Sequence, residues 1–271
     1  MEFWQNIYSH FNPVAFSIGD IAVHWYGIMY ALALLSAIFI AKWFIKYDNI
    51  NISQDIFDSY IWWAEIGVIL GARLGYILFY DSNTTYYLTN PWQIFNPYVN
   101  GTYVGIAGMS YHGAFIGFII ASILFCKRKN ISFWFITDIA VLGISAAYVF
   151  GRIGNFFNQE LVGRVTDVSW GIYVDGILRH PSQLYEAFLE GIVVFLILVY
   201  FRNRKKFDGQ LAIMYGIFYT IARIIAEFYR QPDPQIGFIA GNWLTMGILQ
   251  SGAILLICLT IFAIKSKKIT A

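Results

Sequence analysis

The stretch IAVHWYGIMYALALLSAIFIAKWFI, residues 21–45, decides the fold, because Lys42 is its only formally charged residue. A helix that crosses a bilayer needs about 20 consecutive, predominantly apolar residues. The rest of the chain has the same character: 58% of its 271 residues are hydrophobic and only 13% are charged. Soluble globular domains carry about twice that charged fraction. We therefore expect an integral membrane protein.

Seven segments of this kind recur along the chain, and each is expected to form a transmembrane helix. They are 21–45, 60–80, 109–125, 133–150, 184–201, 211–228 and 244–264. The chain shows no repeat of fixed period and no low-complexity linker, so residues 1–271 are expected to form a single membrane domain. The predicted fold class is an all-α integral membrane protein with seven transmembrane helices.

Lysine and arginine are distributed unequally between the loops on the two sides of these spans. One set of loops holds most of them: Lys42, Lys46, Lys127, Arg128, Lys129, Arg202, Arg204, Lys205, Lys206, Lys265, Lys267 and Lys268. The opposite set holds only Arg152, Arg164, Arg179 and Arg230. The positive-inside rule makes the first side cytoplasmic, so we expect the N-terminus outside and the C-terminus inside.

Three segments outside the spans are expected on the outer side. Residues 1–20 lack a basic region and a cleavage site, and their aromatic residues recur at helical spacing, which favours a retained interfacial segment. Residues 81–108 are rich in Tyr, Trp, Asn and Pro, which is typical of an interfacial lobe. Within 151–181, Asp175-Gly176 predicts a β-hairpin. Together, the two lobes predict a small outer cap.

Composition also bears on cofactors and partners. Cys126 and Cys258 lie in or at the ends of apolar spans, so no disulfide framework is expected. Four scattered histidines, without an HExxH or CxxC pattern, give no reason to expect a metal site. The net charge of +2 follows from the loop asymmetry, so no nucleic-acid partner is indicated.

The polar cluster GRIGNFFNQELVGR, residues 151–164, stands at the outer end of the fourth span. Unpaired polar groups cost several kcal/mol in hydrocarbon, which favours a working site there. In the sixth span Tyr219, Arg223 and Glu227 are spaced four apart and lie along one helical stripe. The alternative to a functional role is that Arg223 and Glu227 form an ion pair that is purely structural.

Other polar residues in the spans have competing interpretations. Arg73 lies in the outer half of the second span, where it serves either the site or packing with Glu65. His24, beside Trp25, is better explained as an interfacial anchor. His112 lies between two glycines in GMSYHG, residues 108–113, which leave space around the backbone, and it is a candidate for catalysis.

Several blocks together resemble one family, the bacterial prolipoprotein diacylglyceryl transferases. The blocks are, in chain order, VHWYGIMY, GMSYHGAFIG, GRIGNFFNQELVGR, HPSQLYE and RIIAEFYRQPD. They run from about Val23 to the seventh span, and an ordered set of motifs is more specific than any one alone. A small departure is Ala114, where a second glycine is expected after the histidine.

The resemblance implies an enzyme of the bacterial plasma (inner) membrane, with its active site towards the outer face. Its reaction would move the diacylglyceryl group of phosphatidylglycerol to the lipobox cysteine thiol of a prolipoprotein. The products would be a thioether and glycerol phosphate, in the first step of lipoprotein maturation, with no cofactor. The implied catalytic residues are His112, Arg223, Arg152 and Glu160. The implied substrate-binding residues are Arg152, Asn155, Gly163, Tyr26, Tyr219 and Glu227.

The chemistry of that reaction needs these residue types. A thiol of pKa about 8.5 must lose its proton to attack carbon, and a histidine of pKa about 6.5 is suited to be the base. Guanidinium groups of Arg152 and Arg223 can hold phosphate bidentately and stabilise charge on the leaving group. Glu160 either orients an arginine or relays a proton, and an arginine-centred route instead of a His112 base stays open.

Two other function classes, a transporter and a structural scaffold, fit the sequence less well than a transferase. A transporter predicts polar residues through both halves of the membrane. Here they crowd the outer half, apart from Glu65. A purely structural membrane scaffold would have no need for the polar cluster. The transferase therefore accounts for the sequence best.

Overall fold

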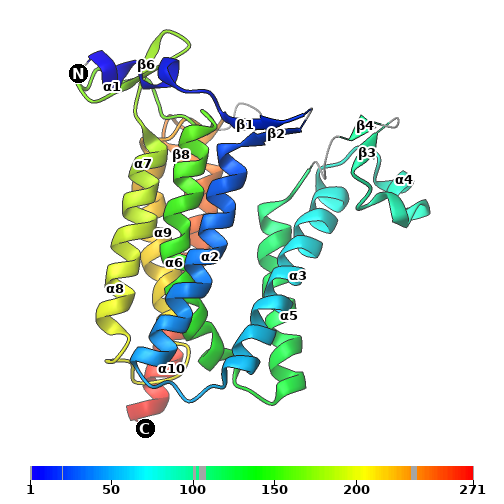
Figure 1. Ribbon diagram of the computed structural model, residues 1–271. Helices are drawn as coiled ribbons and strands as arrows, with labels where there is room; N and C mark the ends of the chain where they lie inside the picture. The colour runs from blue at the N-terminus through cyan, green and yellow to red at the C-terminus, as the bar shows by residue number, and fades with distance from the viewer. Residues whose placement is uncertain (1, 20, 100–101, 104–107, 233–236, 271) are drawn as a thin grey trace. The chain divides into compact units, whose positions relative to one another are not determined.

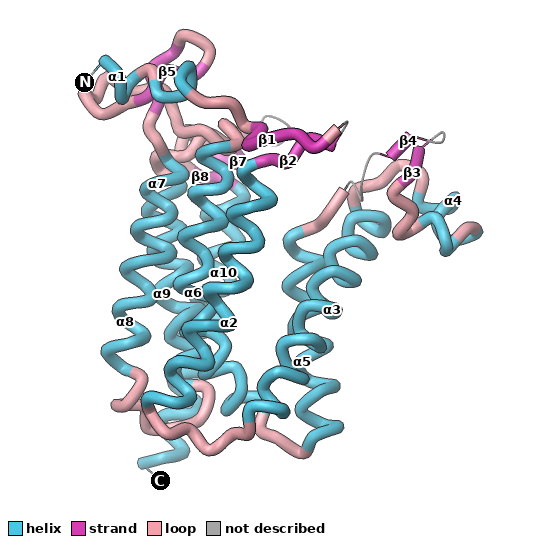
Figure 2. Tube along the Cα trace, viewed as in Figure 1, coloured by secondary structure: helices cyan, strands magenta, loops and turns pink. Residues whose placement is uncertain are grey.

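The computed structural model describes residues 2–19, 21–99, 102–103, 108–232 and 237–270 (Figure 1). Parts of the predicted segments 1–20 and 81–108, and the last residue of the RIIAEFYRQPD block, lie outside the described residues. The chain divides into two compact units, Met1–Ile50 with Trp134–Ala271, and Asn51–Phe133. Helices dominate each unit, and among the described residues the strands occur in short hairpins (Figure 2).

Six helices in the described part of the chain are long and apolar enough to cross a membrane. They are α2 (Trp25–Tyr47), α3 (Gln54–Phe79), α5 (Tyr111–Lys129), α6 (Phe133–Phe157), the helix Ser182–Phe201 and α10 (Met246–Thr270). The helix Ser182–Phe201 consists of α7 (Ser182–Glu186), the π-helical segment η3 (Ala187–Val193) and α8 (Val194–Phe201). A mostly helical, multi-pass membrane protein is confirmed.

The predicted span at 211–228 is also a helix, α9 (Gln210–Glu227), but it is not among those six. Its start is held by a buried carboxylate on α6. The backbone N–H groups of Gly209 and Ala212 each donate to Asp138, at 3.0 Å. Gly209 has a φ of +90°, and a Cβ there would lie 2.3 Å from Cε3 of Trp134. α6 therefore holds the first turn of α9 in place. This contact helps to set the position of the opposite end of α9.

The core of the first unit lies between four of its helices. Its fully or nearly buried members are Phe44, Val141, Leu142, Val194, Leu198, Leu211, Met214 and Ala222. They come from α2, α6, α8 and α9, and their packing aligns the ends of these helices. In Figure 1, α1 and the C-terminal end of α10 lie at opposite ends of this unit.

The described part of the first unit contains three antiparallel hairpins. They are β1 (Val14–Ile18) with β2 (Ile21–His24), β5 (Ile172–Val174) with β6 (Ile177–Arg179), and β7 (Phe238–Ala240) with β8 (Leu244–Thr245). The hairpin predicted at Asp175-Gly176 is present, with both turn residues at positive φ, 51° and 77°. Residues 21–24, predicted as the start of a span, are instead strand β2, so α2 begins at Trp25.

The N-terminal segment packs on the β5–β6 hairpin. It contains α1 (Glu2–Gln5) and the 3₁₀ helix η1 (Ile7–His10). Trp4 Nε1 donates to the carbonyl of Trp170 at 2.8 Å. Tyr8 is buried in a small cluster with Phe156 and Ile172. This segment therefore braces the end of α6 from which the 151–164 cluster continues.

The second unit is a pair of helices, α3 and α5, with a lobe at one end. The lobe holds α4 (Thr84–Thr89), the 3₁₀ helix η2 (Pro91–Gln93), β3 (Tyr98–Val99) and β4 (Thr102–Tyr103). The two helices approach through glycines: a Cβ at Gly117 would lie 2.0 Å from the carbonyl oxygen of Gly67, and one at Gly113 would lie 2.3 Å from that of Gly71. Small residues of this kind let membrane helices pack backbone to backbone.

This packing predicts that Gly117→Ala destabilises the protein. Overpacking costs about 1–3 kcal/mol, which exceeds the gain of at most about 1 kcal/mol from replacing a helical glycine. Gly252→Ala on α10 is the matched control, because nothing lies within 4 Å of a Cβ there. Thermal unfolding in detergent should give a lower midpoint for Gly117→Ala and an unchanged or higher one for Gly252→Ala. Equal midpoints would contradict the glycine interface.

Candidate functional site

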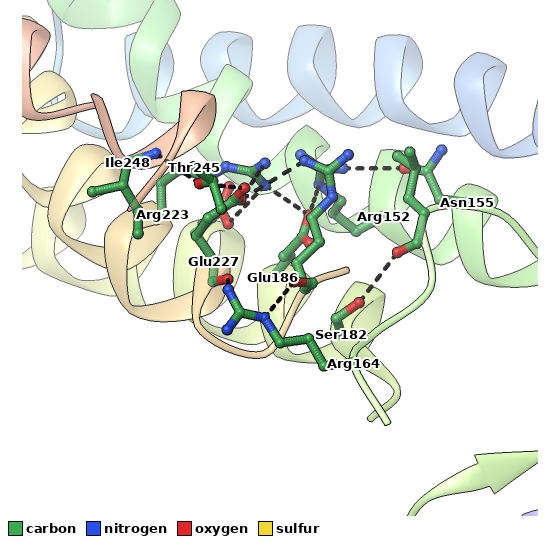
Figure 3. A network of polar contacts seen from close by, with 12 residues as sticks. Arg152, Asn155, Arg164, Ser182, Glu186, Arg223, Glu227, Thr245 and Ile248 are labelled. Atoms are coloured by element: carbon green, nitrogen blue, oxygen red, sulfur yellow. Dashed lines mark hydrogen bonds and ion pairs between the residues drawn. The ribbon is translucent and has the colours of Figure 1, made fainter. Parts of the chain in front are cut away.

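Two arginines from different helices meet on one buried carboxylate in the first unit (Figure 3). Arg152 Nε on α6 lies 2.9 Å from Glu186 Oε2, and Arg223 Nη1 on α9 lies 3.0 Å from the same oxygen. The Glu186 side chain is fully buried, at 0% exposure, whereas those of Arg152 and Arg223 are 15% and 11% exposed. Glu186 therefore supports both guanidinium groups from within and leaves part of each accessible.

A second buried carboxylate lies one turn further along the same helix. Glu190 Oε1 is 3.5 Å from Arg223 Nη1, and the side chain is also fully buried. The hydroxyl group of Tyr148 donates to Glu190 Oε2. Removing an ion from water costs several kcal/mol unless it is paired, so the two carboxylates and the two arginines depend on one another. The resulting cluster carries opposing charges in equal number.

Glu227 extends the cluster towards α10. Arg223 Nη2 lies 2.8 Å from Glu227 Oε2, so the predicted pair four residues apart is present. Thr245 Oγ1 donates to Glu227 Oε1 at 3.0 Å, and the same Thr245 oxygen accepts from the backbone N–H of Ile248 at 3.2 Å. Glu227 thus joins the end of α9 to the start of α10, as a structural ion pair would, while its arginine also reaches Glu186.

The 151–164 segment folds back onto Arg152. Asn155 Oδ1 accepts from Arg152 Nη1 at 3.4 Å, and Asn155 Nδ2 donates to Glu160 Oε1 at 2.7 Å. Gln183 Nε2 donates to the carbonyl of Glu160 at 2.5 Å. Gln159 has a positive φ of 57°, which helps the backbone turn sharply after α6. Asn155 is therefore the link between Arg152 and Glu160.

Gly163 and Arg164 hold the end of this segment in place. A Cβ at Gly163 would lie 2.2 Å from the carbonyl oxygen of His180, so a side chain has no room. Arg164 donates from Nε to the carbonyl of Arg230 at 3.0 Å and from Nη2 to that of Glu227 at 3.1 Å. Arg164 therefore binds the backbone at the end of α9 with these two hydrogen bonds.

His180 is a neutral neighbour of the site. Burial lowers the pKa of His180 below its usual value, against the opposing effect of Asp167, which favours the neutral form of the ring. Its Nδ1 lies 3.2 Å from the Tyr185 hydroxyl, which also accepts from Trp170 Nε1 at 2.7 Å. These contacts position the loop that carries Gly163.

Both tyrosines predicted to belong to the site, Tyr26 and Tyr219, lie in the first unit. The Tyr219 hydroxyl is 3.5 Å from that of Tyr148, and their rings meet edge to face with centroids 5.4 Å apart. The Tyr26 ring on α2 is 42% exposed, and its Cδ2 would lie 3.3 Å from a Cβ at Gly154. The predicted residues joined by hydrogen bonds or ion pairs in this unit are Arg152, Asn155, Glu160, Tyr219, Arg223 and Glu227, linked through Tyr148, Glu186 and Glu190.

His112 and Arg73 belong to the second unit. His112 is exposed in the first turn of α5, and its Nδ1 is 3.5 Å from the Tyr80 hydroxyl. Arg73 is only 5% exposed and donates to the carbonyls of Ile94 at 2.5 Å and Gly108 at 3.2 Å. These bonds tether the lobe of that unit to α3.

The arrangement in the first unit suits an anion. In the described part of the chain, no three His, Cys, Asp or Glu side chains lie close enough to share a metal ion. Two partly exposed guanidinium groups held side by side can instead bind a phosphate by charge-assisted hydrogen bonds. Their buried carboxylates fix them in place before the anion arrives, which is the condition for electrostatic stabilisation of a transition state.

The sequence prediction missed Tyr148, Glu186 and Glu190. Glu186 lies in the HPSQLYE block and Glu190 lies four residues on, near the start of an apolar span. A charge inside a span costs about 2.5–3.5 kcal/mol on insertion scales, which is the signal that identified Arg223 and could have identified both carboxylates. Tyr148 gave no such signal, because tyrosines are abundant in this chain.

Comparison with known proteins places these residues in a family context. A family model described as prolipoprotein diacylglyceryl transferase matches residues 13–264. A protein of Aliarcobacter butzleri is 77% identical over 98% of both chains, and one of Campylobacter jejuni is 59% identical over 99% of both. Each is named phosphatidylglycerol–prolipoprotein diacylglyceryl transferase. From the match over nearly its whole length, the chain belongs to the prolipoprotein diacylglyceryl transferase family.

Proposed function

We propose that this chain transfers the diacylglyceryl group of phosphatidylglycerol to the lipobox cysteine thiol of a prolipoprotein. The sulfur forms a thioether with the glyceryl carbon, and the C–O bond to phosphate breaks to release glycerol phosphate. The observation that carries the proposal is the pair of arginines on Glu186, which provides a phosphate site in a chain of this family. The relatives at 77% and 59% identity are named for this reaction.

Arg152 and Arg223 are assigned to the phosphate of the lipid. Both remain charged, and both can stabilise the charge that develops on the leaving oxygen. Asn155 and Glu160 orient Arg152 through the contacts at 3.4 and 2.7 Å. Glu227 orients Arg223 at 2.8 Å. In this assignment Tyr219, Tyr26 and Gly163 shape the surroundings of the lipid.

His112 is assigned as the base that takes the thiol proton. The alternative is an arginine-centred route. Arg152 and Arg223 are both ion-paired with a buried carboxylate, and such pairing favours the protonated guanidinium. A group that keeps its proton cannot remove one from a thiol, so the ion pairs favour His112. His112 is exposed in the first turn of α5, so a peptide can approach its ring, although the neighbouring Gly113 is packed against Gly71.

The proposed topology has seven spans in the bacterial inner membrane, as one membrane domain. The N-terminus and the cap face outward, and the C-terminus faces the cytoplasm, which the loop charges support. α9 is the seventh span, since pairing with Glu186 and Glu190 reduces the cost of placing Arg223 in a membrane. The family match over 13–264 includes residues of both units, which supports a single functional domain.

The proposed function is tested with purified protein in vesicles, a lipobox peptide and two lipids. Phosphatidylglycerol should be a donor and phosphatidylethanolamine a poor one, because an ammonium group beside Arg152 and Arg223 is a like-charge contact costing several kcal/mol. Mass spectrometry identifies the thioether peptide and the released headgroup. Absence of the thioether with phosphatidylglycerol would contradict the proposed function, and efficient release of phosphoethanolamine would contradict charge selection by the arginines.

Glu186→Gln should lower the rate of transfer strongly. Removing one partner of a buried ion pair costs about 3–5 kcal/mol, and here two arginines lose their shared carboxylate. We expect kcat/KM to fall at least about 100-fold, as for loss of a preorganised charge. The control is Asp48→Asn, which breaks the 3.0 Å pair with Arg202 away from the site and should keep activity. Equal activity of both variants would refute the role of Glu186.

His112→Asn should change the pH dependence of transfer. A general base contributes about 100- to 10,000-fold, so the loss should be greatest near neutral pH. Activity should recover partly as pH rises towards the thiol pKa of about 8.5, because the thiol then ionises without help. His10→Asn is the matched control, since His10 is exposed and stacks on Phe3. A loss of the same size at every pH would argue for a binding role instead.

A further inference from the structure

One tyrosine hydroxyl connects Arg152 to the second buried carboxylate. Tyr148 lies four residues before Arg152 on α6, so the two side chains share one face of the helix. Its hydroxyl accepts from Arg152 Nε at 2.7 Å and also from Nη2. The same hydroxyl donates to Glu190 Oε2 and lies 3.5 Å from the Tyr219 hydroxyl. Tyr148 is thus the meeting point of the guanidinium, the carboxylate and the second tyrosine.

These contacts decide which N–H groups of Arg152 can bind a ligand. A guanidinium carries five N–H donors. Among the described residues, Arg152 shares its Nε hydrogen between Tyr148 and Glu186, and it gives hydrogen bonds from Nη2 to Tyr148 and from Nη1 to Asn155. One N–H group then remains on each terminal nitrogen. Nη1 and Nη2 are both bonded to Cζ, so these two N–H groups can pair with two oxygens of one phosphate.

We propose that Tyr148 is a positioning residue, which fixes the rotation of the Arg152 guanidinium so that these two N–H groups face the lipid phosphate together. The inference rests on the proposed function and adds a residue to it. A hydroxyl is the group needed there, because it accepts from the cation and donates to the anion while remaining neutral. A carboxylate at this place would instead compete with the phosphate for Arg152.

The obvious substitution is Tyr148→Phe, which keeps the ring and removes the hydroxyl. Arg152 Nη2 then loses its acceptor, Arg152 Nε keeps only Glu186, and Glu190 Oε2 loses its donor. Hydrogen bonds to charged groups are among the stronger ones, so we expect kcat/KM to fall about 10- to 100-fold. The fall should come from a higher KM for phosphatidylglycerol, with the KM for the lipobox peptide unchanged.

Tyr60→Phe is the matched control. Tyr60 is a buried tyrosine on α3 whose hydroxyl lies 3.1 Å from Ser122 Oγ, so this change removes one buried hydroxyl beside a neutral partner. Its KM for phosphatidylglycerol should equal that of the wild type. A rise in KM as large as that of Tyr148→Phe would show that loss of any buried hydroxyl suffices and would overturn the proposal.

A double-mutant cycle with Arg152→Lys separates positioning from structural damage. Lysine has no planar fork to orient, so Tyr148→Phe should cost less than about 2-fold in that background. Any loss of folded protein appears equally in both backgrounds and would make the effects additive. Additive effects, an unchanged KM for phosphatidylglycerol in the single variant, or a raised KM for the peptide alone would each overturn the proposal.

The same experiment separates this inference from the proposed function. Wild-type protein that makes no thioether peptide from phosphatidylglycerol would refute both. Wild-type protein that does so, together with a Tyr148→Phe variant of wild-type kinetics, would refute only the role of Tyr148. The cycle uses the full chain throughout, in vesicles of a zwitterionic lipid that contain graded mole fractions of phosphatidylglycerol.

Discussion

The carboxylate of Glu186 is the contact on which the rest of the site depends. It is fully buried, and it holds Arg152 at 2.9 Å and Arg223 at 3.0 Å. A buried charge is stable only with partners, and Glu186 has partners on two helices at once. The ends of α6 and α9 must therefore meet at the helix that carries Glu186. The docking of α9 by Asp138 and the bracing of α6 by the N-terminal segment both serve that meeting.

This constraint also explains how the site suits its chemistry. The arginines are held in place before a ligand binds, so in the proposed reaction little reorganisation is needed when charge develops on the leaving phosphate. Each guanidinium is still partly exposed, at 15% and 11%. Glu190 and Glu227 also contact Arg223, at 3.5 and 2.8 Å, and the Tyr148 hydroxyl group links Glu190 to Arg152 by hydrogen bonds. The same ion pairs therefore contribute to the stability of the protein and to the proposed binding of an anion.

Much of this could be predicted from the sequence, for physical reasons that differ between residues. Long apolar segments identify membrane helices because a bilayer demands length, and Asp175-Gly176 identifies a hairpin because its turn needs positive φ. Arg152 and Arg223 are predicted as site residues because charged residues near hydrocarbon are costly, and the resemblance to the family adds Asn155. The strand at residues 21–24 and the sharing of Glu186 could not be predicted, because both depend on tertiary contacts. Arg73 belongs to the same costly class, yet its guanidinium holds the carbonyls of Ile94 and Gly108.

The most direct test is an electron cryo-microscopy structure of the full chain with a non-cleavable phosphonate analogue of phosphatidylglycerol. The phosphonate oxygens are expected within hydrogen-bonding distance of guanidinium nitrogens of both Arg152 and Arg223, with Glu186 still between the two arginines. A phosphonate group bound elsewhere, with no contact to either arginine, would contradict the phosphate site built on Glu186.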